Sequence, residues 1–302
     1  MTYFIKRFTL LLIATITLGC SKDDDGATQN SSTPRLISFT KNENTYQISY
    51  DSDNNPQALI SPTNTITPII YTDNKLTSFW NDTYTYDSEG RLKTITNSDG
   101  TCTLIYNIQN QLIRQDLTIN NSLNGNSTLT IQRNLAYNDN NQLIEVTETT
   151  NNNSNIEKYT LTYNQVGQVV RMVNSFSNTT NSFNIVRDDM DIIYHTSKNP
   201  LYELYKKMEL HDNITFIEMP QLEASNSSNI SIGNYVYFRI YYISENSPSN
   251  IDKTSYSNNS SLTTTQQYSY LTENNYPIAA DLTVTYNNSS VTIPLNWEYS
   301  NL

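Results

Sequence analysis

A short repeat constrains the fold of this chain more than any other feature. In each copy a tyrosine ends one segment, Asp or Asn residues follow, and an apolar residue opens the next segment. The clearest copy is Tyr84-Thr-Tyr86-Asp87-Ser-Glu-Gly90-Arg91-Leu92. The Asp or Asn after the tyrosine can cap its own turn, and the Gly or Asn three residues later tolerates a positive φ. Each copy therefore predicts a β-hairpin with a type I turn and a β-bulge. Further copies begin at Tyr50, Tyr71, Tyr106, Tyr137 and Tyr163, and weaker ones at Tyr194, Tyr270 and Tyr286.

The segments between the turns alternate between apolar and polar residues. Tyr159, Leu161 and Tyr163 share one face of a strand, and threonines occupy the other. Residues 129–137 and 291–299 alternate in the same way, with Arg133 as an exception on the apolar face. A period of two with one polar face predicts an antiparallel sheet with one face in water. With 23 Tyr, only 7 Gly and 16% charged residues, the composition also favours an all-β, surface-exposed protein.

The N-terminus has the three parts of a secretory signal. Lys6 and Arg7 are basic, residues 8–18 are largely apolar, and Gly19-Cys20 follows. The apolar run is shorter than the ~20 residues that span a bilayer, so a signal peptide over residues 1–19 is the prediction. The end of the run resembles a bacterial lipobox, which implies acylation of Cys20, although Thr17 departs from the preferred leucine. The alternative is an ordinary secretory signal with an incidental cysteine.

An acidic segment follows the cysteine directly. Ser21, Lys22, Asp23, Asp24 and Asp25 resemble the export signal of Bacteroidetes lipoproteins that reach the outer leaflet of the outer membrane. A solvated tether and anchoring on the periplasmic face are the alternatives. We expect a lipidated acidic tether over residues 20–35 and a single β-meander domain over residues 36–302.

Charge limits the partners of the exported chain. The first 19 residues hold two basic and no acidic side chains, so the remainder has 16 basic against 29 acidic residues, a net charge of −13. Such a surface repels phosphate backbones, which argues against nucleic-acid binding. It also argues against docking onto anionic lipid through side chains, so the lipid on Cys20 is the expected route to a membrane.

The sequence Y-x-Y-D-x-x-G-R-L resembles the YD repeat of Rhs-type proteins. In a lipoprotein of this size it is similar to a Bacteroidetes family of unknown function with a porin-like fold. The resemblance covers roughly residues 45–299 and implies a strongly curved antiparallel meander that closes toward a barrel. It brings no known catalytic residues. Irregular spacing of the copies leaves the strand count and the closure open.

Five segments depart from the hairpin pattern. Asn199 and Pro200 predict the start of a helix that runs to Met208, with an apolar stripe that either packs on the sheet or binds a partner. Residues 235–243, which include Arg239, predict a strand covered on both faces. Residues 244–267 predict a long exposed loop. Residues 147–158 and 174–184 predict polar hairpin tips.

Candidate reactive residues are few. His195 and His211 cannot form a three-histidine zinc site, and we expect both to be structural. Asp188, Asp189 and Asp191 form a weak candidate for a Ca²⁺ site, and the alternative is a charged strand edge. Asp51, Asp53 and Asn55 imitate part of a calcium loop, and the alternative is turn capping. Cys102 predicts a buried strand cysteine, and no cofactor is expected beyond the lipid on Cys20.

These observations favour a non-enzymatic, lipid-anchored scaffold of the outer membrane, on the cell surface in preference to the periplasmic face. Its ligand or partner would be a glycan, a peptide or an envelope protein. One alternative is an accessory protein of an outer-membrane assembly that uses the helix face or a free sheet edge. The other is a carbohydrate-active enzyme, which needs two facing carboxylates that the sequence does not select.

Overall fold

The computed structural model describes residues 34–41, 43–98, 100–121, 127–151, 153–178, 181–208, 244–257, 260–287 and 289–301. These residues form eighteen β-strands and one α-helix. In chain order the elements are β1 Arg35–Lys41, β2 Asn44–Tyr50, β3 Pro56–Ile60, β4 Ile66–Thr72, β5 Lys75–Phe79, β6 Asp82–Tyr86, β7 Leu92–Asn97, β8 Gly100–Tyr106, β9 Leu112–Asn121, β10 Ser127–Tyr137, β11 Leu143–Thr150, β12 Asn153–Tyr163, β13 Val169–Asn178, β14 Asn181–Lys198, α1 Pro200–Lys207, β15 Asn246–Ser257, β16 Ser260–Glu273, β17 Tyr276–Tyr286 and β18 Ser289–Ser300.

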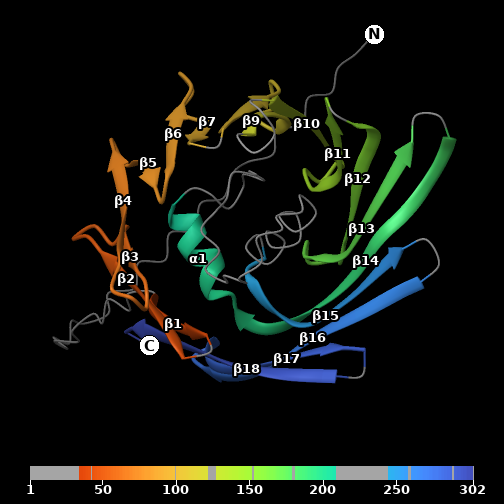
Figure 1. The fold of residues 1–302 in the computed structure, drawn as a ribbon. Helices are drawn as coiled ribbons and strands as arrows, with labels where there is room; N and C mark the ends of the chain where they lie inside the picture. Colours follow the sequence, from red (N-terminus) through yellow and green to blue (C-terminus); the bar gives the residue numbers. More distant parts are fainter. Residues whose placement is uncertain are drawn as a thin grey trace, which may run out of the picture. The chain divides into compact units, whose positions relative to one another are not determined.

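The strands form a closed antiparallel barrel in which each strand pairs with its neighbours in the chain (Figure 1). The first and last strands close the ring, because β1 pairs with β18 from Arg35 opposite Ser300 to Lys41 opposite Leu295. The predicted all-β meander that closes to a barrel is therefore confirmed. Closure also means that none of the eighteen described strands has an unpaired edge.

The predicted turn chemistry is present in five hairpins at one end of the barrel. In the turn between β6 and β7, Asp87 Oδ1 accepts hydrogen bonds from the backbone N–H groups of Glu89 and Arg91 at 3.0 and 2.8 Å. Gly90 has a φ of 78°, and a bulge falls between Thr85 and Tyr86. Asp51, Asn107, Asn138 and Asn164 cap their turns in the same way.

The copy at Tyr71 differs from the prediction. Thr72 pairs with Lys75, which leaves a two-residue turn of Asp73 and Asn74. Their φ values are 52° and 61°, as a type I′ turn requires. The reason is that Asp73 lies two residues after the tyrosine, so it enters the turn itself and cannot cap it from outside.

The apolar face of the meander points inward. One cluster of buried side chains runs around the inner wall from β1 to β15 and includes Leu76, Ile95 and Met172. Cys102 on β8 is fully buried in it, as predicted. The outer wall instead carries exposed cross-strand pairs of hydroxyl side chains, which hydrogen-bond to each other. Among these pairs are Thr85–Thr94 at 2.6 Å, Thr254–Thr263 at 3.1 Å and Thr283–Thr292 at 3.2 Å.

The helix forms where the sequence predicts it. The Asn199 side chain accepts a hydrogen bond from the Leu201 backbone N–H, and Pro200 is the first helical residue. Leu204 and Met208 are buried in the core cluster, so the apolar stripe of the helix packs against the inside of the barrel. In the part of the chain that the structure describes, no helix has both the length and the apolarity needed to cross a membrane.

Two expectations need correction. Residues 244–267 are not a loop, because they supply β15 and most of β16. Thr254 and Thr263 form an exposed outward pair, while Ile251 is buried inward, so the low apolar content of the segment conceals a strand pair. Most of residues 147–158 and 174–184 belong to strands, because β11 ends at Thr150 and β12 begins at Asn153, while β13 ends at Asn178 and β14 begins at Asn181.

Several predictions concern residues outside the described ranges. These are the signal peptide, Cys20 and the segment Ser21 to Asp25, the strand predicted at 235–243 with Arg239, and His211.

Candidate functional site

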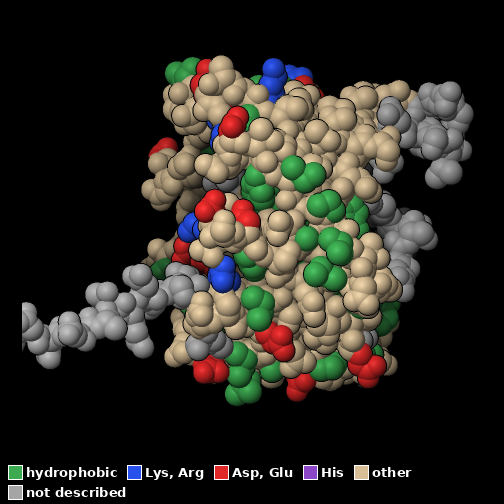
Figure 2. Space-filling view, turned by 90° about the vertical axis from the view of Figure 1, so that its left-hand side faces the viewer, with side chains coloured by type: hydrophobic (Ala, Val, Ile, Leu, Met, Phe, Trp, Pro, Cys, Tyr) green, Lys and Arg blue, Asp and Glu red, His purple; other side chains and the backbone are tan. Residues whose placement is uncertain are grey.

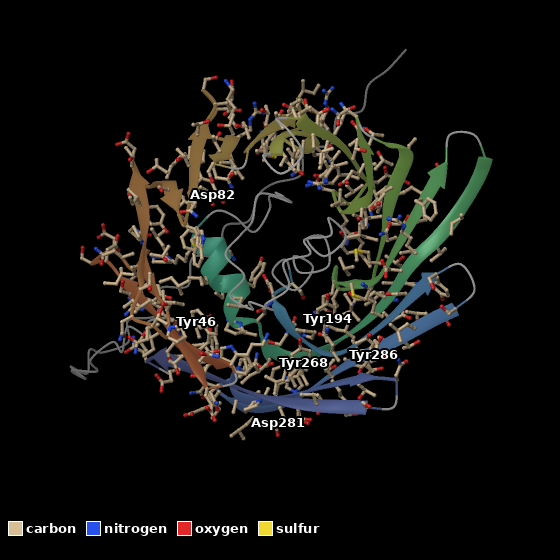
Figure 3. The ribbon with its side chains drawn as sticks, in the orientation of Figure 1. Tyr46, Asp82, Tyr194, Tyr268, Asp281 and Tyr286 are labelled. Carbon is tan, nitrogen blue, oxygen red and sulfur yellow. The ribbon has the colours of Figure 1, made fainter. Side chains whose placement is uncertain are left out.

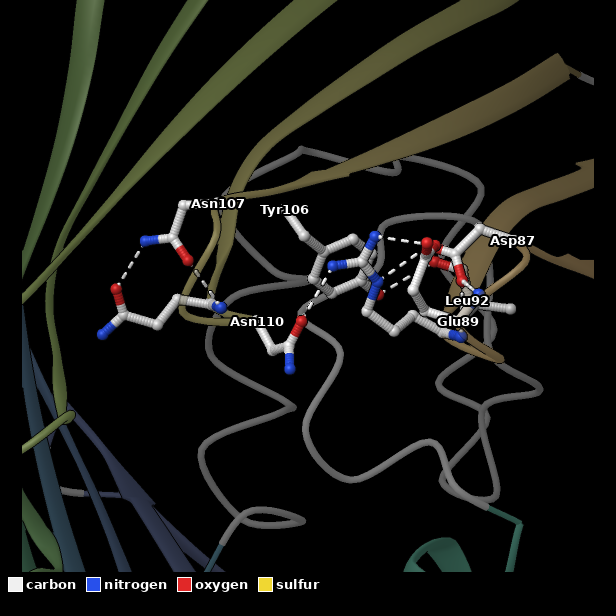
Figure 4. A network of polar contacts seen from close by, with 8 residues as sticks. Asp87, Glu89, Leu92, Tyr106, Asn107 and Asn110 are labelled. Carbon is white, nitrogen blue, oxygen red and sulfur yellow. Dashed lines mark hydrogen bonds and ion pairs between the residues drawn. The ribbon is translucent and has the colours of Figure 1, made fainter.

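The repeated tyrosines form a ring of hydrogen bonds at one end of the barrel, which we call the tyrosine rim. Each tyrosine lies at or near the end of a strand, and its hydroxyl donates to a backbone carbonyl at the start of the preceding strand. Tyr106 in β8, for example, donates to the Leu92 carbonyl of β7 at 2.8 Å (Figure 4). The same bond is made by Tyr50 to Leu36, Tyr86 to Leu76, Tyr137 to Leu112, Tyr163 to Leu143, Tyr194 to Val169, Tyr270 to Pro248 and Tyr299 to Pro277.

Side chains of neighbouring turns link the tyrosine rim further. Arg91 donates to Asp87 at 2.7 Å and to Asn110 of the next YD-type turn at 2.9 Å, and its guanidinium lies 4.8 Å from the centre of the Tyr106 ring (Figure 4). Gln111 continues the series to Asn141 at 2.5 Å. Burial raises the pKa of Tyr106 to about 12. Because these phenols bind backbone carbonyls, their hydroxyl groups serve the structure of the barrel and are not available to a ligand.

A second group of aromatic residues lines the inner wall, and we call it the aromatic strip. Its members face inward from β1, β2, β14, β16 and β18 and are Phe39, Tyr46, His195, Tyr268, Tyr270 and Trp297. Tyr46 stacks on Phe39 with ring centres 4.9 Å apart, and Phe39 is paired in register with Trp297. Figure 3 shows Tyr46 and Tyr268 on the inner side of the wall and Asp281 on the outer side.

The other half of the aromatic strip is built around a small residue. Tyr270 lies 6.2 Å from Trp297 and 5.1 Å from His195, measured between ring centres. Between their strands, β17 places Ala280 opposite Tyr270, and its single methyl group leaves room for the two rings to meet. Tyr268 and Tyr270 lie with parallel planes 5.8 Å apart. The rings of this half are half-buried, so each keeps an exposed part.

His195 presents one defined nitrogen. Its Nδ1 accepts a hydrogen bond from the Ser197 backbone N–H at 3.0 Å. The proton of the neutral ring is therefore on Nε2. This arrangement leaves the Nε2–H group as a hydrogen-bond donor on the aromatic strip.

Charged side chains gather on the inner wall of β10 to β14. Arg133 binds Glu148 at 2.5 Å, and these side chains are 1% and 3% exposed. Glu148 is opposite Glu157 in register, and Glu157 binds Arg187 at 2.6 Å and accepts from the Tyr159 hydroxyl at 3.1 Å. Burial raises the pKa of Glu148, the ion pair with Arg133 opposes this, and Glu157 adds to the rise.

These two glutamates are the pair that the sequence could not select. A glycosidase needs one carboxylic acid and one free carboxylate on either side of the bond that it cleaves. Here each carboxylate is matched by its own arginine, and Glu148 is almost fully buried. The arrangement therefore suits a neutralised structural charge cluster better than acid–base chemistry.

The three candidate calcium ligands do not converge. Asp188 accepts from Ser255 at 2.6 Å and binds Lys253 at 3.2 Å. Asp189, on the opposite face of the strand, binds Arg171 at 2.6 Å, and Asp191 lies 3.9 Å from the same arginine. Asp51, the other candidate, caps its own turn. Within the described ranges, no group of three or more His, Cys, Asp or Glu side chains is arranged to hold a metal ion.

Comparisons with known proteins give no family for this chain. No family description and no curated protein matches the sequence. Among solved structures, a porin-like protein from Bacteroides vulgatus aligns with a TM-score of 0.45 and 10% identity over 89% of this chain and 100% of its own. A porin-like protein from Bacteroides uniformis aligns with a TM-score of 0.43 and 12% identity over 88% and 96%.

A third match is much longer than this chain. The structure of TcdB2-TccC3-Cdc42 aligns at a TM-score of 0.34 and 10% identity, covering 85% of this chain but 15% of that one. All three TM-scores lie below 0.5.

Sequence reasoning missed both groups of inner-wall residues. Arg133 gave the one usable signal, as a charge on an apolar face, but its partner Glu148 lies in the next strand. The alternation over residues 291–299 puts Trp297 on an apolar face. Tyr268, in contrast, directly follows residues 244–267, for which the sequence predicts a loop.

Proposed function

We propose that this protein is a lipid-anchored, surface-exposed β-barrel that has no catalytic role and binds a glycan at its inner wall. The polarity of the two walls carries the proposal. A barrel that spans a membrane has an apolar outer band and a polar interior. This barrel has the reverse pattern, with its buried apolar cluster inside and exposed threonine pairs outside. Such an outer wall favours water, so acylation of Cys20 is the route that attaches the barrel to the outer membrane.

The aromatic strip supports a glycan as the ligand. Flat rings pack well against the C–H faces of sugars, and nearby polar groups can bond sugar hydroxyls. Tyr268, Tyr270 and Trp297 supply partly exposed rings, and His195 supplies an N–H donor. The strip itself carries no carboxylate or lysine, which favours a neutral oligosaccharide over a charged one.

The anchor is tested by fractionating cells that express Cys20→Ala. We expect the variant to lack the lipid and to leave the membrane fraction, while the unaltered protein remains there and is cleaved by protease added to intact cells. A Cys20→Ala protein that stays membrane-bound contradicts the anchor. An unaltered protein that resists the protease contradicts surface exposure.

Binding is tested by calorimetric titration of the purified protein with a panel of neutral oligosaccharides. Tyr268→Ala removes one ring, so we expect the binding free energy to weaken by about 1 kcal/mol. Tyr256→Ala removes a ring that is 46% exposed on the outer wall and should leave affinity unchanged. Equal effects of the two substitutions, or no binding by any sugar in the panel, contradict the glycan proposal.

The two alternatives have less support. An accessory role in an outer-membrane assembly could not use the apolar helix face, which is packed in the core, or an edge of the described barrel, which is closed. A carbohydrate-active enzyme that used Glu148 and Glu157, which adjoin on the inner wall, would have both carboxylates neutralised by arginines. Glycosidase activity that is lost in Glu157→Gln would favour the enzyme over the binding protein.

A further inference from the structure

One part of the outer wall departs from the polar pattern. Leu59 and Ile69 are buried inward, so strand alternation turns Ile60, Pro68 and Ile70 outward. Ile66 and Ile70 are 66% and 48% exposed. We call this group the outer apolar patch and define it as Ile60, Ile66, Pro68, Ile70 and Trp80. Figure 2, which faces the side of the barrel where β2 to β5 lie, shows hydrophobic side chains gathered across the middle of that face.

The two strands that carry the patch pair directly with each other. Ile60 is opposite Ile66, so outward apolar residues adjoin across the pair. Elsewhere the corresponding outward positions hold threonine pairs such as Thr85–Thr94 and Thr254–Thr263. The patch is therefore a local exception and not the general character of the wall.

Trp80 extends the patch into a strained turn. Phe79 at the end of β5 pairs with Asp82 at the start of β6, so Trp80 is the first residue of a two-residue turn. Phe79 also pairs with Ile69 of β4, so Trp80 follows directly after the residue that lies opposite Ile69. Its φ is 59°, which is a costly conformation for a bulky side chain, and the ring is 45% exposed. Strain of this kind concentrates at sites that bind something.

Charge is absent from the patch. The stretch from residue 54 to residue 72 contains no Asp, Glu, Lys or Arg, in a chain whose net charge is −11. If another surface covered this stretch, none of its side chains would pay the cost of removing a charge from water. An occupant is expected to be uncharged at its own surface, because the rest of the molecule repels anions.

The tether brings a bilayer within reach of this surface. Residues 21–34, which separate Cys20 from the barrel, span at most about 50 Å when extended. They join β1, which pairs with β2, and β2 pairs with β3. At ~4.8 Å between strands, β4 lies only about 14 Å along the wall from β1.

We infer that the outer apolar patch seats the barrel against the interface of the membrane that holds its lipid. This inference relies on the anchor of the proposed function. The apolar side chains enter the boundary between headgroups and acyl chains, and Trp80 lies at the headgroup level, where aromatic rings with one polar end are favoured. The surface recognised is an electrically neutral lipid interface.

Tryptophan fluorescence tests the inference directly, because the sequence contains two tryptophans, Trp80 and Trp297. The mature protein with Trp297→Phe therefore reports on Trp80 alone. It is reconstituted into phosphatidylcholine vesicles with and without brominated acyl chains. We expect a blue-shifted Trp80 emission that the brominated chains quench.

Two variants provide the comparison. Ile66→Asn combined with Ile70→Asn should keep the protein on the vesicles through its lipid but abolish the quenching. Ile193→Asn, on the opposite side of the barrel and 60% exposed in the unaltered protein, should retain it. Loss of quenching in Ile193→Asn as well contradicts a local patch.

Mass spectrometry of the same samples reads the lipid on Cys20 separately. A lipidated protein whose Trp80 is not quenched overturns the patch but leaves the anchor intact. An unlipidated protein whose Trp80 is still quenched supports the patch and contradicts the anchor. Protection of Trp80 from acrylamide without quenching by bromine means that another protein surface covers the patch, which also overturns the inference.

Discussion

At the scale of single residues, the most consequential feature is the ion pair between Arg133 and Glu148 inside the wall. Removing two charges from water is costly, and their attraction offsets that cost only while both partners remain. Glu157 and Arg187 extend the pair into a four-charge cluster across neighbouring strands. Balance within the cluster therefore matters more than any one of its members.

Breaking this ion pair tests the balance. Glu148→Ala leaves the Arg133 charge buried, so we expect the free energy of unfolding to fall by about 3–5 kcal/mol in urea denaturation. Glu145→Ala breaks a pair with Lys158 whose side chains are 38% and 36% exposed, and it should cost at most about 1 kcal/mol. Similar losses in the two variants would show that the buried cluster has no special role.

The tyrosine rim predicts a particular response to alkali. Burial raises the pKa values of Tyr50, Tyr106 and Tyr163 to about 12 each. The folded pKa exceeds the ordinary value near 10, so this contribution to stability is complete below pH ~10 and is lost as the pH rises through 12. Absorbance at 295 nm and circular dichroism should therefore change together in that range. Full ionisation of all tyrosines near pH 10 with an intact β signal would contradict the rim.

At the scale of elements, the turns at the tyrosine rim share one backbone requirement. The fourth residue of the turn needs a positive φ, and Asn54, Gly90, Asn110, Asn141 and Gly167 supply it with values from 62° to 84°. Two residue types thus serve one purpose in different copies. This explains why glycine is scarce in a chain with so many hairpins.

Gly167 offers a matched test of that requirement. A Cβ added there would meet only Gln142 Nε2 at 3.6 Å, an ordinary contact, so any loss must come from the backbone. We expect Gly167→Ala to lower the free energy of unfolding by about 1–2 kcal/mol and Gly167→Asn to cost clearly less. Thermal unfolding of the two variants measures the difference, and equal melting temperatures would contradict the explanation.

The elements that the sequence predicts well are those built from local contacts. Asp87 and Gly90 define their hairpin within four residues, and Asn199 with Pro200 defines the start of α1. The strand pair of β15 and β16 escaped prediction, because its outward Thr and Ser residues resemble loop residues until partner strands are known. The site residues depend even more on register. Glu148 meets Glu157, and Tyr270 meets Trp297 over Ala280, through pairings that no short window of sequence contains.

At the scale of the whole molecule, the barrel depends on one junction between distant parts of the chain. Arg35 and Ser300 lie opposite each other, and the Arg35 side chain donates to the Ser300 hydroxyl at 3.2 Å. Among the described strands, every other pairing joins two strands that are consecutive in the chain order. The junction between β1 and β18 therefore decides whether the meander is a barrel or an open sheet.

Engineered cysteines can report on this junction. Thr40 and Asn296 are paired in register, so Thr40→Cys with Asn296→Cys should form a disulfide under mild oxidation, visible as a mobility shift on a non-reducing gel. Thr40→Cys with Asn250→Cys joins strands that are not neighbours and should not cross-link. Cross-linking in both double variants, or in neither, would contradict the closed ring.

This junction also sets an order in time. β1 is the first strand of the barrel to be synthesised, and β18, its partner on one side, is the last. The chain is made from its N-terminus, so that edge of β1 stays without its partner until the rest of the barrel has been made. During that interval its N–H and C=O groups offer a template to any other extended chain. A chain that ends before β18 would then be an open sheet prone to aggregation, so a premature stop codon near the 3′ end of the reading frame should be nearly as damaging as one near its middle.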